Sequence, residues 1–129
     1  MVKLVCCLRR RPDITREEFA KHWREKHIHC AGRDAAKVLG IRRYVQLHAL
    51  PEAVNRELQA VRHGEDDFDG VAEVWLDDAD AYDRYWRKSP EGAKALQAFV
   101  DDERNHFVDL SRTVFFLAEE NVVIDGPTS

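Results

Sequence analysis

Three side chains in the N-terminal third of the chain repeat every four residues and end on a histidine. Phe19, Trp23 and His27 stand at positions i, i+4 and i+8, which places them on one stripe of an α-helix. That stripe is expected to face a sheet, so that His27 lines the core or a cavity. Because an imidazole exchanges a proton near neutral pH, His27 is the candidate general acid or base. The alternative is a core histidine hydrogen-bonded to the backbone.

Further polar side chains surround this stripe. His22 follows Phe19 by three residues and is a second catalytic candidate, with a structural hydrogen bond as the alternative. His29 and Cys30 are expected to belong to the helix end. Zinc sites use characteristic ligand spacings, and His22 and His27, five residues apart, diverge on a helix. No metal site is therefore predicted.

Glu73 lies in the apolar segment 70–76 and shares its strand phase with Val71 and Trp75. A carboxylate among apolar neighbours is costly to bury unless it is paired. Burial also tends to raise its pKa, which makes Glu73 a candidate proton carrier. The alternative is an ion pair with an arginine such as Arg43. Trp75 is expected to form a cavity wall against which an aromatic ligand stacks.

Polar and apolar residues alternate along the segment 41–50, with Tyr44, Gln46 and His48 in the polar phase. The apolar phase is expected to meet the helices, so the polar phase is expected to face a cavity on the other side of the sheet. Tyr44 and His48 are then candidate substrate contacts. With the phase reversed, both become surface residues.

The remaining elements follow from β-rich runs, turn clusters and helix start signals. Strands are expected at residues 2–9, 41–50, 70–76 and 112–119. Helices are expected at residues 16–30, 79–88 and from 90 onward. Thr15 and Glu18 form a capping box at the start of the first helix. Three carboxylates near the end of the last helix are expected to be solvated: Asp102, Glu103 and Asp109.

The order β-α-β-connection-β-α-α-β predicts an α+β fold of the ferredoxin-like, split βαβ kind, with a four-stranded antiparallel sheet and helices on one face. Large apolar residues occupy both strand phases, as at Val74 and Trp75, although a sheet exposed on one side alternates more cleanly. A second copy of the sheet is therefore expected to cover the other face. The resulting homodimer is a dimeric α+β barrel, and its interior is the expected ligand cavity.

Composition narrows the class of protein. The 129 residues, 44% hydrophobic and 34% charged, favour one domain over residues 1–129, with a connection at 51–68 and a C-terminal tail at 120–129. A net charge of -4 gives no basic surface for nucleic acid, and no apolar run is long enough for a membrane span. Three cysteines, two of them adjacent, favour a reducing, cytoplasmic location over a disulfide framework.

Several segments resemble the EthD-like family of the dimeric α+β barrel superfamily. They include F-x-x-H-W-x-x-x-H at residues 19–27, F-D-G-x-x-E-x-W at 68–75, and D-D-E-R-N-H-F-V-D-L at 101–110. The family usually has Gly-Pro after the second histidine, where this chain has Ile28 and His29. The resemblance implies a dimeric barrel with a central pocket, and it implies Asp102 and Asp109 as structural anchors.

The resemblance implies function only loosely, because one fold supports many chemistries. Relatives resemble cofactor-free dehydratases or decarboxylases of aromatic polyketide pathways, or accompany ether-degrading oxidoreductases. The leading hypothesis is a cofactor-free enzyme that dehydrates, cyclises or decarboxylates a small hydrophobic, aromatic or polyketide-like substrate. The alternatives are an oxygen-activating oxidoreductase, either cofactor-free or with haem held by His27, and a non-catalytic ligand-binding protein. The expected site comprises His27, Glu73 and His22 as catalytic residues, and Trp23, Tyr44, His48 and Trp75 as substrate contacts.

Overall fold

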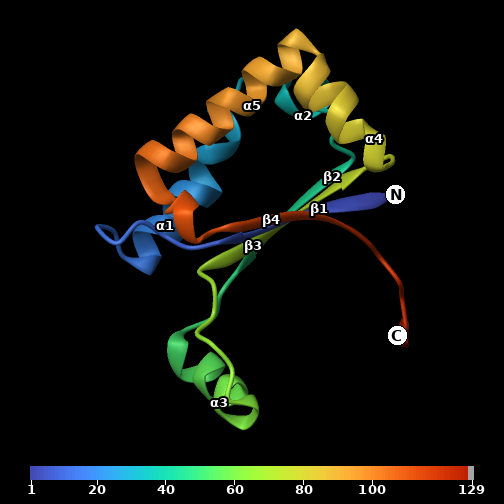
Figure 1. Ribbon diagram of the computed structural model, residues 1–129. Helices are drawn as coiled ribbons and strands as arrows, with labels where there is room; N and C mark the ends of the chain where they lie inside the picture. Colours follow the sequence, from blue (N-terminus) through green and yellow to red (C-terminus); the bar gives the residue numbers. More distant parts are fainter. Residues whose placement is uncertain (128–129) are drawn as a thin grey trace.

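A four-stranded antiparallel sheet with strand order β2-β3-β1-β4 forms the centre of the computed structural model, which describes residues 1–127 (Figure 1). The strands are β1 (Val2–Leu8), β2 (Arg43–His48), β3 (Gly70–Leu76) and β4 (Val114–Glu119). All four lie inside the segments predicted from the sequence. This order is the ferredoxin-like arrangement, and the predicted fold class is confirmed.

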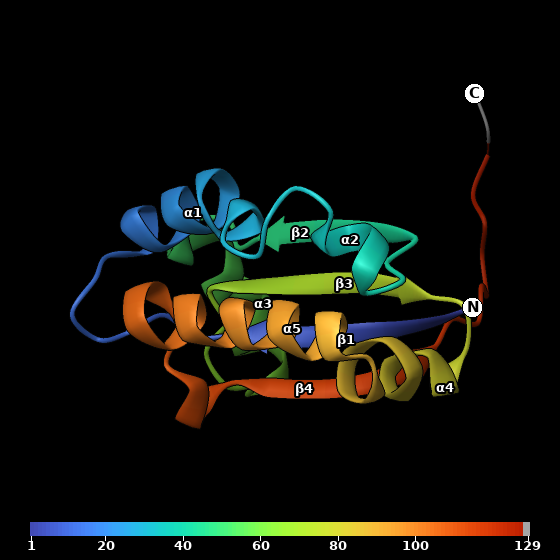
Figure 2. The ribbon, with the colours of Figure 1, turned by 90° about the horizontal axis from the view of Figure 1, so that it is seen from above.

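The helices that cover the sheet lie on one face. They are α1 (Arg16–Glu25), α2 (Ala35–Val38), α4 (Ala79–Ala81) and α5 (Pro90–Asp102), with π-helical turns at Tyr82–Lys88 and Glu103–Phe107. Seen from above, α1 and α2 lie along β2, and α5 runs along β1 (Figure 2). Within residues 1–127, none of the helices has both the length and the apolar character that a membrane crossing requires.

The first helix begins as predicted and ends earlier. Thr15 accepts a hydrogen bond from the backbone of Glu18, and the Glu18 side chain accepts one from the backbone of Thr15, which completes the capping box. The prediction that this helix continues to residue 30 is wrong. After α1 the chain tightens into a 3₁₀ turn, in which the Cys30 amide donates to the His27 carbonyl at 3.2 Å. His27 therefore begins this turn, although it remains in line with Phe19 and Trp23 as a buried residue.

The core lies between the sheet and the helices. Alternate residues of β1 and β3 are buried there, among them Leu4, Cys6, Ala72 and Val74. The register pairs Leu4 with Val74 on one side and with Leu117 on the other, so these side chains share the helix-facing side of the sheet. The opposite phase forms an open face, across which no helix of residues 1–127 packs (Figure 1).

Two segments project on the side of that open face (Figure 1). The 51–68 connection contains α3 (Glu52–Arg62), which has no buried residue. After β4 the chain turns to the same side, where the apolar residues Val122, Val123 and Ile124 are exposed. The last two residues of the predicted 120–129 tail lie outside the described residues.

Candidate functional site

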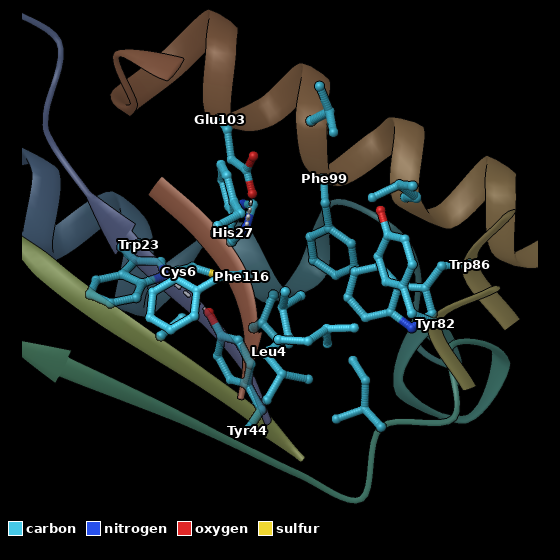
Figure 3. A pocket seen from close by; sticks show the side chains of 18 residues that line it. Leu4, Cys6, Trp23, His27, Tyr44, Tyr82, Trp86, Phe99, Glu103 and Phe116 are labelled. Carbon is cyan, nitrogen blue, oxygen red and sulfur yellow. Dashed lines mark hydrogen bonds and ion pairs between the residues drawn. The ribbon is translucent and has the colours of Figure 1, made fainter. Parts of the chain in front are cut away.

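A pocket of about 450 Å³ lies between the helices and the sheet (Figure 3). Its walls are mostly apolar and aromatic. The sheet side contributes Leu4, Cys6, Ile41, Tyr44, Ala72, Val74, Phe115, Phe116 and Leu117, and the helix side contributes Trp23, His27, Ile28, Tyr82, Trp86, Leu96, Phe99, Val100 and Glu103. The sequence placed the cavity on the other face of the sheet, between two copies of the chain. The structure shows this pocket on the helix side of the sheet, lined by the elements of a single chain.

The orientation of β2 explains the difference. Tyr44 and Gln46 face the helices, whereas Leu47 in the other phase is 48% exposed. The Trp23 indole nitrogen donates to the Tyr44 hydroxyl at 3.0 Å, and the Gln46 amide donates to the Trp23 carbonyl at 3.1 Å. Because buried polar groups are tolerated when they are hydrogen-bonded, α1 accommodates the polar phase. The predicted rule that the apolar phase meets the helices is wrong for this strand.

The Tyr44 hydroxyl is a hydrogen-bond donor available to a ligand in the pocket. It accepts from Trp23 and, at 3.4 Å, from the Gln46 amide, and both groups can only donate at these atoms. Neither contact uses the hydroxyl hydrogen. Burial raises the pKa of Tyr44 and outweighs the opposing hydrogen bonds from Gln46 and Trp23. The hydroxyl therefore keeps its proton at neutral pH.

His48 supports this arrangement from behind Trp23 and does not line the pocket. Its Nε2 lies 2.9 Å from the Gln46 side-chain oxygen, which can only accept, so the proton is on Nε2. Its Nδ1 is buried with no partner among the described residues. Burial, together with the charge of Arg24, lowers the pKa of His48. A neutral His48 packs on the Trp23 ring, with ring centroids 4.7 Å apart, and supports the pocket wall without being part of it.

His27 is held between the carboxylates of Asp102 and Glu103 at one end of the pocket, and Figure 3 shows Glu103 beside its ring. Its Nδ1 donates to Asp102 Oδ2 at 2.7 Å, and its Nε2 lies 3.5 Å from Glu103 Oε2. The residue is buried, with 6% of its surface exposed, and the rings of Phe99 and Phe107 pack edge-on against the imidazole, with centroids 5.0 Å away. A carboxylate that accepts from Nδ1 fixes the tautomer, so Nε2 is the nitrogen left for proton transfer.

The end of α5 brings these two carboxylates to the ring. A π-helical turn begins at Glu103, where the Val108 amide donates to the Glu103 carbonyl at 2.8 Å, and such turns are frequent at functional sites. The expectation that Asp102 and Glu103 are solvated is wrong. A helical pattern could have found Glu103, because Leu96, Phe99 and Glu103 follow one face of α5 and all line the pocket.

Asp102 also contacts His22 from the opposite side. His22 Nε2 lies 3.0 and 3.1 Å from the two Asp102 oxygens, and its ring stacks on His106 with centroids 5.3 Å apart. His22 is not among the lining residues of the pocket. Burial raises the pKa of Asp102, but the hydrogen bonds and charges of His27 and His22 outweigh it and hold the pKa below its ordinary value. Asp102 is therefore an anion that orients both imidazoles.

Replacing Asp102 with asparagine is expected to destabilise the fold by about 1.5–3 kcal/mol at neutral pH, because hydrogen bonds to a charged group are lost. A carboxyl whose folded pKa is depressed stabilises the protein above its unfolded pKa, and this contribution disappears as the pH falls through the folded pKa. The difference in the free energy of unfolding between wild type and Asp102→Asn should therefore decrease as the pH is lowered. Urea unfolding across a pH series measures it, with the exposed Asp101→Asn as the control. A constant difference at all pH values would contradict the role of the charge.

Glu73 and Trp75 lie on the open face and do not line the pocket. The Lys3 ammonium pairs with Glu73 at 3.1 Å and with Glu120 at 2.7 Å. It also lies 4.3 Å from the Trp75 ring centroid, and the Arg43 guanidinium lies 4.8 Å from that centroid. The partner of Glu73 is therefore Lys3 rather than Arg43. The sheet separates this cluster from His27, so the structure does not bring the two proton-transfer candidates together.

A possible metal-ligand set also includes His27. One ligand atom each from His27, Cys30 and Asp102 lie within 4.8 Å of one another. Burial, with the charges of Asp102 and Glu103, raises the pKa of the Cys30 thiol to about 11, whereas metals bind the thiolate. Asp102 is also occupied by two imidazoles. These donors suit the hydrogen-bonded arrangement better than a metal site.

Comparisons with known proteins agree with this architecture. A family model described as the EthD domain matches residues 11–111. The chain is similar in structure to an ethyl tert-butyl ether D (EthD) family protein from Bacillus halodurans, with 19% identity, 94% of this chain and 99% of that chain covered, and a TM-score of 0.58. It is also similar to a dimeric protein of unknown function and ferredoxin-like fold from Bacteroides fragilis, with 15% identity, coverage of 92% and 95%, and a TM-score of 0.53. None of the curated proteins compared with the chain matches it.

Proposed function

The chain belongs to the EthD family, as its sequence motifs predict, and we propose that it is a cofactor-free enzyme that transfers protons on a hydrophobic, aromatic or polyketide-like substrate. The observation that carries this proposal is the position of His27, with Nδ1 fixed by Asp102 and Nε2 beside Glu103 at the wall of an apolar pocket. A carboxylate that orients an imidazole is a recurrent arrangement for general acid–base catalysis.

The reaction that suits these groups is the loss of water from a carbon next to a carbonyl. His27 Nε2 removes the proton from that carbon, and the electron pair of the C–H bond forms the new double bond. The neighbouring C–O bond breaks, and the departing hydroxyl takes the proton from His27 and leaves as water. The Tyr44 hydroxyl donates to the substrate carbonyl, where negative charge develops. The mostly apolar walls limit the access of water to the site.

The haem alternative fits the site less well. A haem iron needs an uncrowded imidazole nitrogen in an apolar pocket. The available nitrogen of His27 lies 3.5 Å from the Glu103 carboxylate, so iron on that nitrogen would have to displace the carboxylate. Proton transfer at His27 Nε2 requires no bond to that nitrogen other than the one to the proton.

The second part of the proposal is that the chain works as a homodimer joined through the open face of the sheet. Apolar residues are exposed on this face, with Leu47 and Val114 each 48% accessible, and extended exposed apolar surface is typical of interaction sites. The same face is flanked by α3 and the apolar tail (Figure 1). The pocket lies on the other side of the sheet, so each copy would contain its own site.

Turnover of hydroxylated bicyclic and tricyclic ketones, assayed without oxygen and after treatment with a chelator, tests the proposed reaction. We expect a product lighter by one water, formed at the same rate with and without oxygen. A strict requirement for oxygen would favour the oxidoreductase instead. Tight binding of these ketones with no product of any kind would favour a ligand-binding role. Mass spectrometry of the reaction mixture distinguishes the three outcomes.

A further inference from the structure

We infer that the pocket accepts uncharged ligands and excludes carboxylates, and that Glu103 determines this selectivity. The inference rests on the proposed function, and it narrows the reaction to dehydration or cyclisation, because the substrate of a decarboxylation carries a carboxylate. It follows from the charges around the pocket rather than from its shape.

The polar end of the pocket does not become positive in any protonation state of its two imidazoles. His22, His27, Asp102 and Glu103 form one connected cluster, with contacts of 2.7 to 3.5 Å. If both imidazoles are protonated, two positive charges balance two carboxylates. If either imidazole is neutral, the cluster carries a net negative charge. A ligand carboxylate placed at this end therefore meets at best a neutral cluster, with the Glu103 carboxylate nearest to the pocket.

The rest of the lining offers no compensating cation. Among the described residues, no lysine or arginine lines the pocket. The Cys6 thiol is protonated, because burial raises its pKa to about 12. The Trp86 indole nitrogen already donates to the Leu39 carbonyl at 2.8 Å. A carboxylate that leaves water needs a cation or several donors in return, and the side-chain hydroxyls of the lining are those of Tyr44 and Tyr82, which are uncharged donors.

The pocket offers a suitable contact for each group of an uncharged aromatic ligand. An aromatic body can lie against Phe99 and the rings of Tyr82 and Trp86, which are tilted relative to each other with centroids 5.3 Å apart. A carbonyl oxygen can accept from the Tyr44 hydroxyl. A hydroxyl or an acidic C–H can approach His27 and Glu103, both of which accept. The selected ligand is therefore an uncharged aromatic ketone or alcohol.

The test compares two probes of nearly equal shape, 2-acetylnaphthalene and 2-naphthoate, at pH 7.5 by isothermal titration calorimetry. The wild-type protein should bind the ketone at least about tenfold more tightly, as expected for repulsion between like charges in a confined site. Glu103→Gln should reduce the ratio of the two dissociation constants by about tenfold, because naphthoate binds more tightly once the negative charge is removed. Glu91→Gln removes the same charge from an exposed position at the other end of α5 and should leave the difference unchanged.

Equal or tighter binding of naphthoate by the wild-type protein would overturn the inference, as would binding of neither probe. An unchanged difference in Glu103→Gln would overturn the role of that residue. If Glu103→Gln does not fold, the wild-type comparison still decides the selectivity. The proposed reaction fails separately: the ketone would then bind with the expected preference, but hydroxylated ketones would not lose water.

Discussion

Replacing His27 with asparagine is expected to reduce the turnover number by about 10²- to 10⁴-fold, the usual contribution of a positioned general acid or base. Asparagine places an amide nitrogen close to the position of Nδ1, so it can still donate to Asp102. It has no atom at the position of Nε2, where the substrate proton would be taken. The dissociation constant of the substrate should change much less than the turnover number, and steady-state kinetics together with ligand titration separate the two.

His22→Asn is the control for this variant, and because asparagine does not reach the position of Nε2, it removes the contact of His22 with Asp102. It makes the same substitution in a histidine that contacts the same carboxylate but does not line the pocket. We expect a much smaller loss of turnover in His22→Asn than in His27→Asn. An equal loss in both variants would assign the effect to disruption of Asp102. Full activity in His27→Asn would remove His27 from the reaction and favour binding without acid–base chemistry.

The sequence predicts the elements of this fold well, because their signals are local. The stripe of Phe19, Trp23 and His27 and the capping box at Thr15 depend only on spacing within a few turns of helix. Each strand is a short β-rich run ended by turn residues. The tightened turn at the end of α1 has no comparable signal, and the predicted helix there is too long.

The assignment of residues to the two faces of the sheet could not be predicted in the same way. Tyr44 points to the helices because the Trp23 indole, 21 residues earlier in the chain, satisfies its hydroxyl. Glu73 is accommodated on the other face because Lys3, 70 residues away, pairs with it. Both facts depend on partners that are distant in sequence. The polarity of one strand by itself does not identify which face is buried.

The burial of the two carboxylates of the site could not be predicted from the sequence either. Asp102 and Glu103 belong to a charged run that is typical of a solvated helix end. Their burial requires the 3₁₀ turn that carries His27 to lie beside the end of α5, which is a tertiary contact. The resemblance to the EthD-like family marked Asp102 as a structural anchor, and its contacts with two imidazoles agree with that role.

The second large expected effect concerns the assembly of two copies of the chain through the open face. Leu47 in β2 and Val114 in β4 lie near opposite edges of this face and are about half exposed in the single chain. In a homodimer joined through the sheets, both positions would lose water in both copies. A carboxylate at either position would then be buried without a partner, at a cost of several kcal/mol.

The double variant Leu47→Glu/Val114→Glu is therefore expected to convert a wild-type dimer into a monomer at micromolar concentration, as measured by sedimentation velocity. Gln97→Glu adds a negative charge to the exposed surface of α5, away from the open face, and should remain a dimer. Because the pocket lies on the other side of the sheet, the monomeric variant should still bind 2-acetylnaphthalene if it remains folded by circular dichroism. A wild-type protein that sediments as a monomer at all concentrations would contradict the proposed dimer. A dimer that persists in the double variant would show that the copies meet through another surface, such as α3 or the tail.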